Sequence, residues 1–461
     1  MFRLASFVSS RVLADASGYA VMADGLLQNG EFIMPLGEAW SLDWSPAYSH
    51  HYSPAYAAYL TPFVAVGGLN PWTIKSASLL SSLGMVFVGW WATNDLYGRR
   101  KALFAAAAVA LDPILLSASG TGYSENFLTI LFVLTIWSIL KSLKDGRFIV
   151  LAGLLAGVAY LTKGVMGWFF LIAGLAGLGW RFHYMGWRVF RDRHYLAAIG
   201  IFGAFVAAWA GRNLARFWDG SLGGLLSSWQ SSAYFAISTD RAAASPGDLG
   251  FILVVRLPLY VAFFLLIGGL WVRELRRLPR LSDEHYSGLW LAVGLTYLLA
   301  WIISGILWVH ERNPVYWLDQ MRYVVVANVL IVWLIVKDAD TEQRVFKRKF
   351  GGTLLVLLVM CLVVSAQPAP GVFDAYERLR EDARPGDVVA IEGLPRYEVM
   401  VNVGPHLTYV RYEPGVSADY ILTSNLAAQY PGYALLASGH TTNAVDGVMP
   451  RFDAAVWQRV P

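Results

Sequence analysis

The sequence predicts an α-helical polytopic membrane protein that ends in a small α/β domain, and three observations lead to this fold class. Of the 461 residues, 56% are hydrophobic and only 15% are charged, whereas a typical soluble chain is about 25% charged. Apolar runs long enough to cross a bilayer, which takes about 20 helical residues, follow one another between residues 73 and 367. After the sequence PAPG, the composition changes to that of a soluble domain.

Residues 1–72 are expected to form an acidic outer loop followed by an interface helix. The loop reads LADASGYAVMADGLLQNGEF, and Asp15 lies just before a stretch with helical periodicity. The apolar residues of this stretch fall on one helical face: Tyr19, Met22, Leu26 and Leu27. Residues 55–69 are apolar but short and contain Pro62, so we expect a helix that lies at the membrane surface rather than a span.

Ten apolar runs within residues 73–367, the predicted transmembrane domain, are expected to span the membrane. They lie near residues 73–97, 99–119, 123–143, 147–163, 165–182, 193–214, 250–272, 287–308, 323–338 and 349–367. Every second connection is rich in Lys and Arg: residues 99–101, 141–147, 181–193, 273–280 and 337–349. Because cytoplasmic connections collect basic residues, the other connections, the N-terminal loop and the C-terminal tail are predicted to face outward.

This topology predicts that one N-terminal helix is missing from the chain, because residues 1–13 are too short and too polar to carry the loop across a membrane. At the other end, residues 368–461 are expected to form an external α/β domain. A helix is predicted over residues 373–383, and strands over residues 388–393, 407–412 and 419–424.

Several classes of function receive no support from the sequence. The net charge of +4 is too small to suggest nucleic-acid binding. The single cysteine, Cys361, lies in an apolar run and excludes an intrachain disulfide. Neither a phosphate-binding GxxxxGK[ST] loop, nor a dinucleotide-binding GxGxxG after a strand, nor an HExxH metal motif occurs.

Two acids on the predicted outer face are candidate catalytic residues. Asp15 stands in the first loop, and Glu125 stands in GTGYSENF at the outer end of a predicted span. An ionisable residue beside a membrane bundle suggests a function. The alternative for each is a structural role at a helix N-terminus, where acidic side chains are favoured.

Three cations at the outer ends of spans, Lys163, Arg212 and Arg322, are candidate ligands of a phosphate group. Arg in particular binds phosphate through paired hydrogen bonds. The alternative is that each side chain only extends to the membrane interface. An acid that accepts a proton, together with cations that hold a phosphate leaving group, is what attack on a lipid-phosphate-linked sugar requires.

His50 and His51, in YSHHYSPAYAAYL, leave three alternatives open. They could bind a divalent metal ion with Asp15 or Glu125, hydrogen-bond to a substrate, or pack at the interface. Neighbouring residues on a helix or strand point in different directions, which argues against joint binding of one metal. No cofactor other than such an ion is expected.

The order of these motifs resembles that of a known enzyme class. An outer loop with Asp15 and then Tyr19 is followed by HHYSPAYAAYL, by LYGRRKALFAAAAVALDPILLSASGTGYSENF and GLLAGVAYLTKG, and later by GRNL and MRYVVVANVLIV. The sequence between residue 11 and about residue 340 is similar to the GT-C class of polytopic glycosyltransferases, in particular to the protein O-mannosyltransferase and aminoarabinose-transferase superfamily.

The resemblance implies an enzyme of the cell membrane that transfers a sugar from a polyprenyl-phosphate donor on the outer face. It implies Asp15 as general base, Glu125 as second acid, and Arg212, Arg322 and Lys163 at the donor phosphate. His50, His51 and Tyr19 would contact substrate, and the acceptor would be a lipid, a glycan or a protein. Two features depart from the family: the helix before the loop is absent, and Asp15 is followed by Ala16 rather than by a second acid.

Other functions stay open at this stage. Asp24, nine residues after Asp15, competes for the role of base. A transporter or lipid flippase, a GT-C ligase or polymerase acting on lipid-linked glycans, and a non-catalytic GT-C-like assembly protein are alternatives. A transporter typically carries charges in the middle of broken spans, whereas here most of the suspect charges lie at one end.

Overall fold

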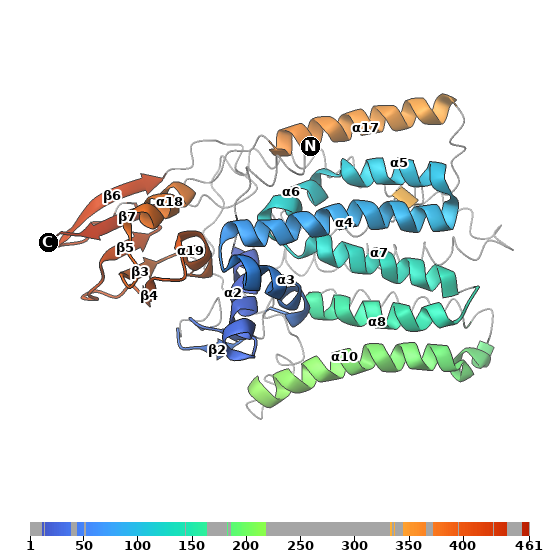
Figure 1. Ribbon diagram of the computed structural model, residues 1–461, viewed down its shortest axis with the longest axis horizontal. Helices are drawn as coiled ribbons and strands as arrows, with labels where there is room; N and C mark the ends of the chain where they lie inside the picture. The colour runs from blue at the N-terminus through green and yellow to red at the C-terminus, as the bar shows by residue number, and fades with distance from the viewer. Residues whose placement is uncertain are drawn as a thin grey trace, which may run out of the picture. The chain divides into compact units, whose positions relative to one another are not determined.

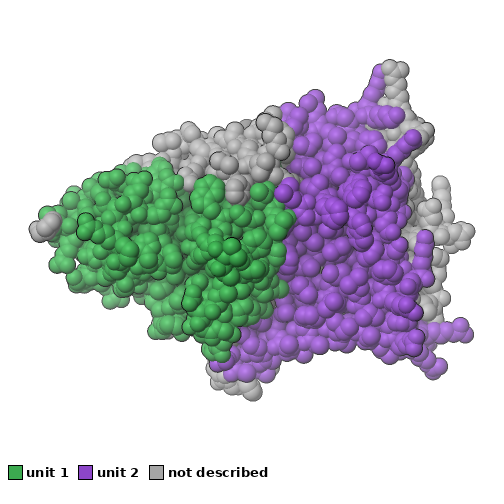
Figure 2. Space-filling model, viewed as in Figure 1, with its two compact units in different colours: residues 1–80, 116–124, 362–461 green, residues 81–115, 125–361 purple. Residues whose placement is uncertain are grey.

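The structure of the protein is a computed structural model, and its described residues form two compact units (Figure 2). Unit 1 comprises residues 1–80, 116–124 and 362–461, and unit 2 comprises residues 81–115 and 125–361. Within these bounds the structure describes residues 12, 14–37, 44–49, 52–142, 144–163, 182, 186–217, 332–333, 336, 344–365, 372–394, 396–426, 428–439 and 454–460.

The N-terminal part of unit 1 consists of two packed helices and a small hairpin. Helix α2 (Ala14–Asn29) packs against α3 (Pro54–Gly67), which continues through Pro62. Strands β1 (Ile33–Met34) and β2 (Ala47–Tyr48), which lie between these helices in the sequence, pair antiparallel. Gly30 ends α2 by adopting a φ of +72°, a conformation that suits glycine.

The burial of α2 does not follow its apolar face. Residues 16–23 are buried around the whole circumference of the helix, whereas Leu27, which belongs to the apolar face, is 41% exposed. The reason is that α2 is enclosed by several neighbours along its first two turns and by few along its last. Periodicity alone describes a helix with one packed side.

The expected span over residues 99–119 is instead two helices, α5 (Arg99–Ala110) and α6 (Pro113–Thr121). Pro113 has no amide hydrogen to continue α5. The carboxylate of Asp112 accepts a hydrogen bond from the Leu115 amide at 3.0 Å and so begins the second helix. An Asp-Pro pair inside an apolar run was therefore the signal for this break.

The helices of unit 2 lie side by side (Figure 1). They are α4 (Pro71–Tyr97), which begins in unit 1, α5, α7 (Glu125–Ser142), α8 (Arg147–Thr162), α10 (Arg193–Phe217) after a short 3-10 turn η1 (Gly186–Arg191), and α17 (Arg344–Ser365). Met85, Phe132 and Ile136 belong to their common apolar core. The buried Trp333 side chain donates a hydrogen bond to Thr93 in α4.

Three of the described helices are long and apolar enough to cross a membrane: α4, α7 and residues 193–216 of α10. Helix α8 and part of α17 are apolar but shorter. Leu196 and Ile199 of α10 are about half exposed, as expected for a helix that faces lipid. The predicted spans 165–182, 250–272 and 287–308, and most of 323–338, lie outside the described residues.

The C-terminal part of unit 1 is a five-stranded sheet with helices on one face. The strands run in the order β4-β3-β5-β7-β6, with β3 parallel to β4 and β5, and β7 antiparallel to β5 and β6. Their bounds are β3 (Val388–Glu392), β4 (Thr408–Arg411), β5 (Tyr420–Thr423), β6 (Tyr433–Gly439) and β7 (Ala454–Arg459). The expected helix and three strands are present, and α19, β6 and β7 were not predicted.

Helices α18 (Val372–Asp382) and α19 (Arg396–Val403) cover this sheet. Val389 and Ile391 of β3 pack against Phe373 and Leu379 of α18 and Val399 of α19 in one buried cluster. The alternate residues of the strands form a second, smaller cluster on the other face. The C-terminal part of unit 1 is therefore a layered α/β arrangement, as the composition of residues 368–461 indicates.

The contact between α8 and α10 gives a test of the packing. A methyl group added at Gly153 would lie 2.5 Å from the backbone oxygen of Ala198, so the two helices would have to separate. We expect Gly153→Ala to lower the free energy of unfolding by about 1–3 kcal/mol, measured by thermal unfolding in detergent. In Gly200→Ala the added methyl group meets no described atom within 4 Å, and this control should leave stability unchanged or higher. Equal effects of the two substitutions would contradict this packing.

Candidate functional site

Asp15 lies in the first turn of α2, on the part of the helix that unit 1 encloses. The position agrees with both alternatives: an acidic side chain favours the positive end of a helix, and a carboxylate there can also accept a proton. Tyr19, one turn later, is buried, with its ring 4.9 Å from that of Tyr52 and 5.2 Å from that of Tyr56, measured between centroids. The helix start that carries Asp15 is thus packed on aromatic rings.

Two glycines allow the close packing around Asp15. A methyl group at Gly18 would lie 2.3 Å from the ring of Tyr52, and one at Gly122 would lie 3.0 Å from the Cβ of Ala16. Gly122 also has a φ of +80° and accepts a hydrogen bond at its carbonyl from the Tyr56 hydroxyl at 2.8 Å. The loop before residue 125 is therefore held against the first turn of α2, beside Asp15.

Glu125 is the first residue of α7 and forms a buried ion pair. The Nζ of Lys163, directly after α8, donates to its Oε1 at 2.9 Å. The two residues are only 2% and 7% exposed. The ion pair offsets the cost of burying each charge, and the N-terminus of α7 adds a favourable field for the carboxylate. The structure thus brings together two of the residues that the sequence singled out.

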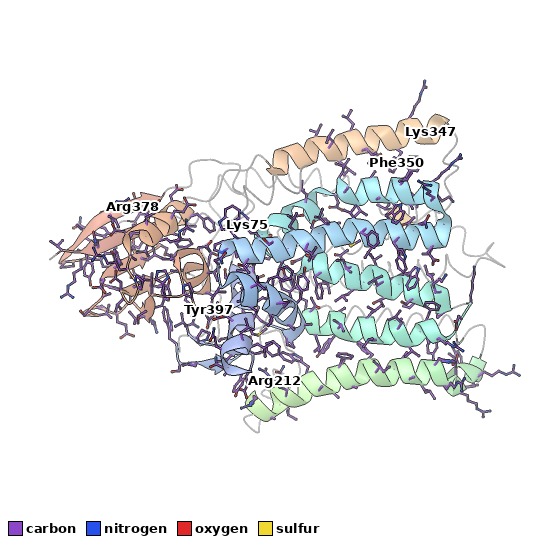
Figure 3. The ribbon with its side chains drawn as sticks, in the orientation of Figure 1. Lys75, Arg212, Lys347, Phe350, Arg378 and Tyr397 are labelled. Atoms are coloured by element: carbon purple, nitrogen blue, oxygen red, sulfur yellow. The ribbon has the colours of Figure 1, made fainter. Side chains whose placement is uncertain are left out.

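A set of hydrogen-bond donors lies on the last turns of α10. The Arg212 guanidinium stacks over the ring of Trp209 at 4.7 Å and donates to the Oδ1 of Asn213 at 2.8 Å. Trp209 is 5% exposed and Asn213 is fully buried. The Trp209 Nε1 and the Asn213 Nδ2 are buried and have no hydrogen-bond acceptor within the described part of the chain. Figure 3 shows Arg212 near the C-terminal end of α10.

The two groups lie at the same end of unit 2. Methyl groups at Gly153 and Gly157 would meet Ala198 and Phe205 respectively, so α8 and α10 run parallel. Their C-terminal ends, which carry Lys163 and Arg212, therefore lie at one level, and the antiparallel α7 begins there with Glu125.

The opposite end of unit 2 is basic. It carries the following residues: Arg99, Arg100, Lys101, Lys141, Lys144, Arg147, Arg188, Arg191 and Arg193. At this end the Asp95 carboxylate of α4 forms an ion pair with Lys141 and accepts a hydrogen bond from the Trp137 indole N–H. The separation of charge along the helices that the sequence indicated is thus present in the fold.

Other predicted site residues have no described geometry. Arg322, His50 and His51 lie outside the described residues. Within the described ranges, no group of three or more His, Cys, Asp or Glu side chains forms a metal site. Asp15 belongs to unit 1 and Glu125 to unit 2.

Trp209 and Asn213 are candidate site residues that were not predicted from the sequence. They stand four residues apart in AAWAGRNLARF, on one face of α10, and a polar residue on the same face as a Trp was the available signal. It is weak, because Trp is common near the ends of spans. Only the structure shows that both polar groups are buried.

The buried pair gives a test that does not depend on activity. We expect Lys163→Met and Glu125→Gln each to lower the free energy of unfolding, by about 3–5 kcal/mol when one charge is left buried alone. The double variant should recover much of this loss. The partly exposed pair Asp95–Lys141, at 3.0 Å, is the control, and its double-mutant cycle should show a coupling below about 1 kcal/mol. Additive losses for Glu125 and Lys163 would show that they do not form an ion pair.

One family model matches a central part of the chain. Residues 51–210 match the family model of the dolichyl-phosphate-mannose-protein mannosyltransferases. The matched part of the chain includes Glu125 and Lys163. No curated protein sequence gives a significant match.

The fold is similar to that of solved membrane glycosyltransferases. The apo structure of ArnT from Cupriavidus metallidurans matches with a TM-score of 0.55 at 14% identity, over 99% of this chain and 96% of that one. The same protein bound to undecaprenyl phosphate matches with a TM-score of 0.53, also at 14% identity, over 100% and 96%.

An oligosaccharyltransferase from Archaeoglobus fulgidus, solved as a complex with Zn and sulfate, matches with a TM-score of 0.54 at 12% identity, over 89% of this chain and 64% of that one. At such identities the likeness concerns the fold. This chain therefore resembles the mannosyltransferase family in sequence and has the fold of the GT-C glycosyltransferases, which confirms the resemblance inferred from its motifs.

Proposed function

We propose that this protein transfers a sugar from a polyprenyl-phosphate donor to an acceptor on the outer face of the cell membrane. The proposal is supported by the shared fold with ArnT, one structure of which holds undecaprenyl phosphate. It is also supported by the family model of the dolichyl-phosphate-mannose-protein mannosyltransferases. The acceptor is a lipid, a glycan or a protein.

The observation that carries the proposal is the group of hydrogen-bond donors on α10. Two buried N–H groups, on Trp209 and Asn213, and the Arg212 guanidinium gather on the last turns of one helix. Burying a donor without an acceptor costs about 1–3 kcal/mol, which a ligand rich in acceptor oxygens would return. A phosphate has such oxygens and the negative charge that Arg212 would balance.

The proposed reaction is a single displacement. Asp15 takes the proton of an acceptor hydroxyl, and the acceptor oxygen forms a bond to the anomeric carbon of the sugar. The bond between that carbon and the phosphate oxygen breaks, and its electron pair stays on the polyprenyl phosphate. Arg212, with Arg322 as a second cation, stabilises the negative charge of this leaving group.

The ion pair assigns different tasks to Glu125 and Lys163. The Lys163 Nζ is already engaged by the Glu125 carboxylate at 2.9 Å, so a phosphate would have to displace that carboxylate. We therefore propose that Arg212 is the main ligand of the donor phosphate, and that Lys163 holds the Glu125 carboxylate in place. Tyr19, His50 and His51 remain proposed substrate contacts, and a divalent metal ion at the histidines remains an alternative.

The proposed orientation places the basic end of unit 2 in the cytoplasm, because basic residues collect on that side. The end with Glu125, Lys163 and Arg212 then faces outward, as do the N-terminal segment and the α/β domain of residues 368–461. The other predicted spans and an interface helix at α3 belong to this proposed topology, with α5 and α6 in place of a single span over residues 99–119.

The base is tested by Asp15→Asn, with Asp24→Asn in the same helix as matched control. Membranes with each variant receive radiolabelled polyprenyl-phosphate monosaccharides, and label that leaves the donor lipid is counted. Asp15→Asn should lower turnover by about 10²–10⁴-fold, because a general base is lost, while the unfolding temperature is retained. Asp24→Asn should be near normal. If Asp15→Asn shows normal turnover and Asp24→Asn loses turnover, then Asp24 and not Asp15 is the general base.

Three variants test the hydrogen-bond donors on α10: Trp209→Phe, Asn213→Leu and Arg212→Gln. Trp209→Phe keeps an aromatic ring under Arg212 but removes the indole N–H. Each should raise the KM for the donor, by about tenfold or more, since hydrogen bonds to a charged group contribute about 1.5–3 kcal/mol. Arg216→Gln, one turn further on the exposed side of α10, is the control and should change KM by less than about twofold. An unchanged KM in the first three variants would place the phosphate elsewhere.

A further inference from the structure

Helix α19 of the C-terminal segment contacts the N-terminal segment of unit 1 through a buried tyrosine. The Tyr397 hydroxyl accepts a hydrogen bond from the Leu36 amide at 3.1 Å and donates one to the Gly37 carbonyl. Tyr397 is 2% exposed, and 360 residues of sequence separate it from Gly37. One side chain thus satisfies two backbone groups in the turn that follows β1.

A second contact from α19 lies close to Asp15. The side-chain amide of Asn402 donates to the carbonyl of Val12 at 3.1 Å and to the carbonyl of Glu398 in its own helix at 2.8 Å. Val12 is fully buried and stands three residues before Asp15. The contact therefore fixes the chain just before the helix start that carries the proposed base, and α19 packs against α2 itself.

Apolar and cationic contacts extend this interface. The Arg396 guanidinium lies 5.0 Å from the centre of the Trp44 ring and is almost fully buried. Leu36, Trp44 and Tyr123 pack against the buried cluster of the α/β segment. Tyr123 belongs to the loop that holds the first turn of α2 through Gly122. The core of the C-terminal segment is thus completed by side chains from both parts of the chain that surround Asp15.

Helix α19 is itself firmly held, as a positioning element requires. Tyr376 of α18 donates a hydrogen bond to the Glu398 carboxylate at 3.2 Å, and both side chains are buried. Burial, followed by the neighbouring Glu398 carboxylate, raises the pKa of the Tyr376 hydroxyl well above its usual value, so this hydroxyl remains a proton donor at any physiological pH. Val399 and Val403 anchor the helix in the same cluster.

We propose that α19 sets the position of Asp15, with Tyr397 and Asn402 as positioning residues that act through the backbone of residues 12–37. The C-terminal segment is then a working part of the proposed catalytic centre and not an appendage to it. The effect on turnover rests on the proposed function, whereas the ordering of residues 12–37 does not.

The test uses the full-length protein in nanodiscs, as wild type and as Tyr397→Phe, Asn402→Leu and Tyr433→Phe. The last is a matched control, because the Tyr433 hydroxyl also accepts from one backbone amide and donates to one carbonyl, both of Ala418. Hydrogen exchange of residues 12–37 is measured by mass spectrometry. Turnover and donor KM are measured with radiolabelled polyprenyl-phosphate monosaccharides.

We expect Tyr397→Phe and Asn402→Leu to speed exchange in residues 12–37 by about tenfold, since each leaves buried backbone groups without partners. Both should lower kcat by about 10- to 100-fold, because small displacements of a catalytic group are costly, with little change in donor KM. Tyr433→Phe should change neither. Unchanged exchange, or faster exchange with unchanged kcat, would overturn the proposal. If the wild type shows no transfer, the proposed function fails, and exchange alone decides whether α19 orders this segment.

Discussion

The ion pair between Glu125 and Lys163 is the constraint on which the architecture of unit 2 depends. A charge buried in an apolar bundle is tolerated only beside its opposite, so the first residue of α7 and the residue after α8 must meet. This contact fixes which ends of the two helices lie together. The parallel packing of α8 and α10 places Arg212 and its neighbours at the same end. The ion pair and this helix packing together gather Glu125, Lys163 and Arg212 at one end of unit 2, opposite the basic end.

Close helix packing makes this arrangement possible. Gly153 and Gly157 leave room for the backbone of Ala198 and the ring of Phe205, so that α8 and α10 can approach each other. In unit 1, Gly18 and Gly122 do the same for the first turn of α2. In both units glycines stand where two elements approach most closely, and larger side chains fill the rest of each core. The polar groups of the proposed site are thus held by packing as much as by hydrogen bonds.

Much of this structure could be predicted from the sequence, and the failures have physical causes. Hydropathy located α4, α7, α8 and α10, because a span is encoded by its own residues. The Asp112–Pro113 break was missed because an apolar run hides a helix boundary from a count of hydrophobic residues. The charge of Glu125, Lys163 and Arg212 marked them for attention, but their partners depend on how helices pack. Asn213 was missed because its burial depends on how α10 packs, and Tyr397 because its partners, Leu36 and Gly37, are distant in sequence.

The contact between Tyr397 and Gly37 also bears on how the protein is made. Residues 12–37 are synthesised long before residues 372–403, yet in unit 1 the two segments pack against each other. Contacts of such large sequence separation are slow to form. While the intervening membrane helices are being synthesised, Val12, Leu36 and Trp44 lack the C-terminal residues that they contact in the folded protein. Apolar surface that stays uncovered during folding is prone to aggregate, so we expect the N-terminal segment to be most vulnerable until residues 372–403 have been made.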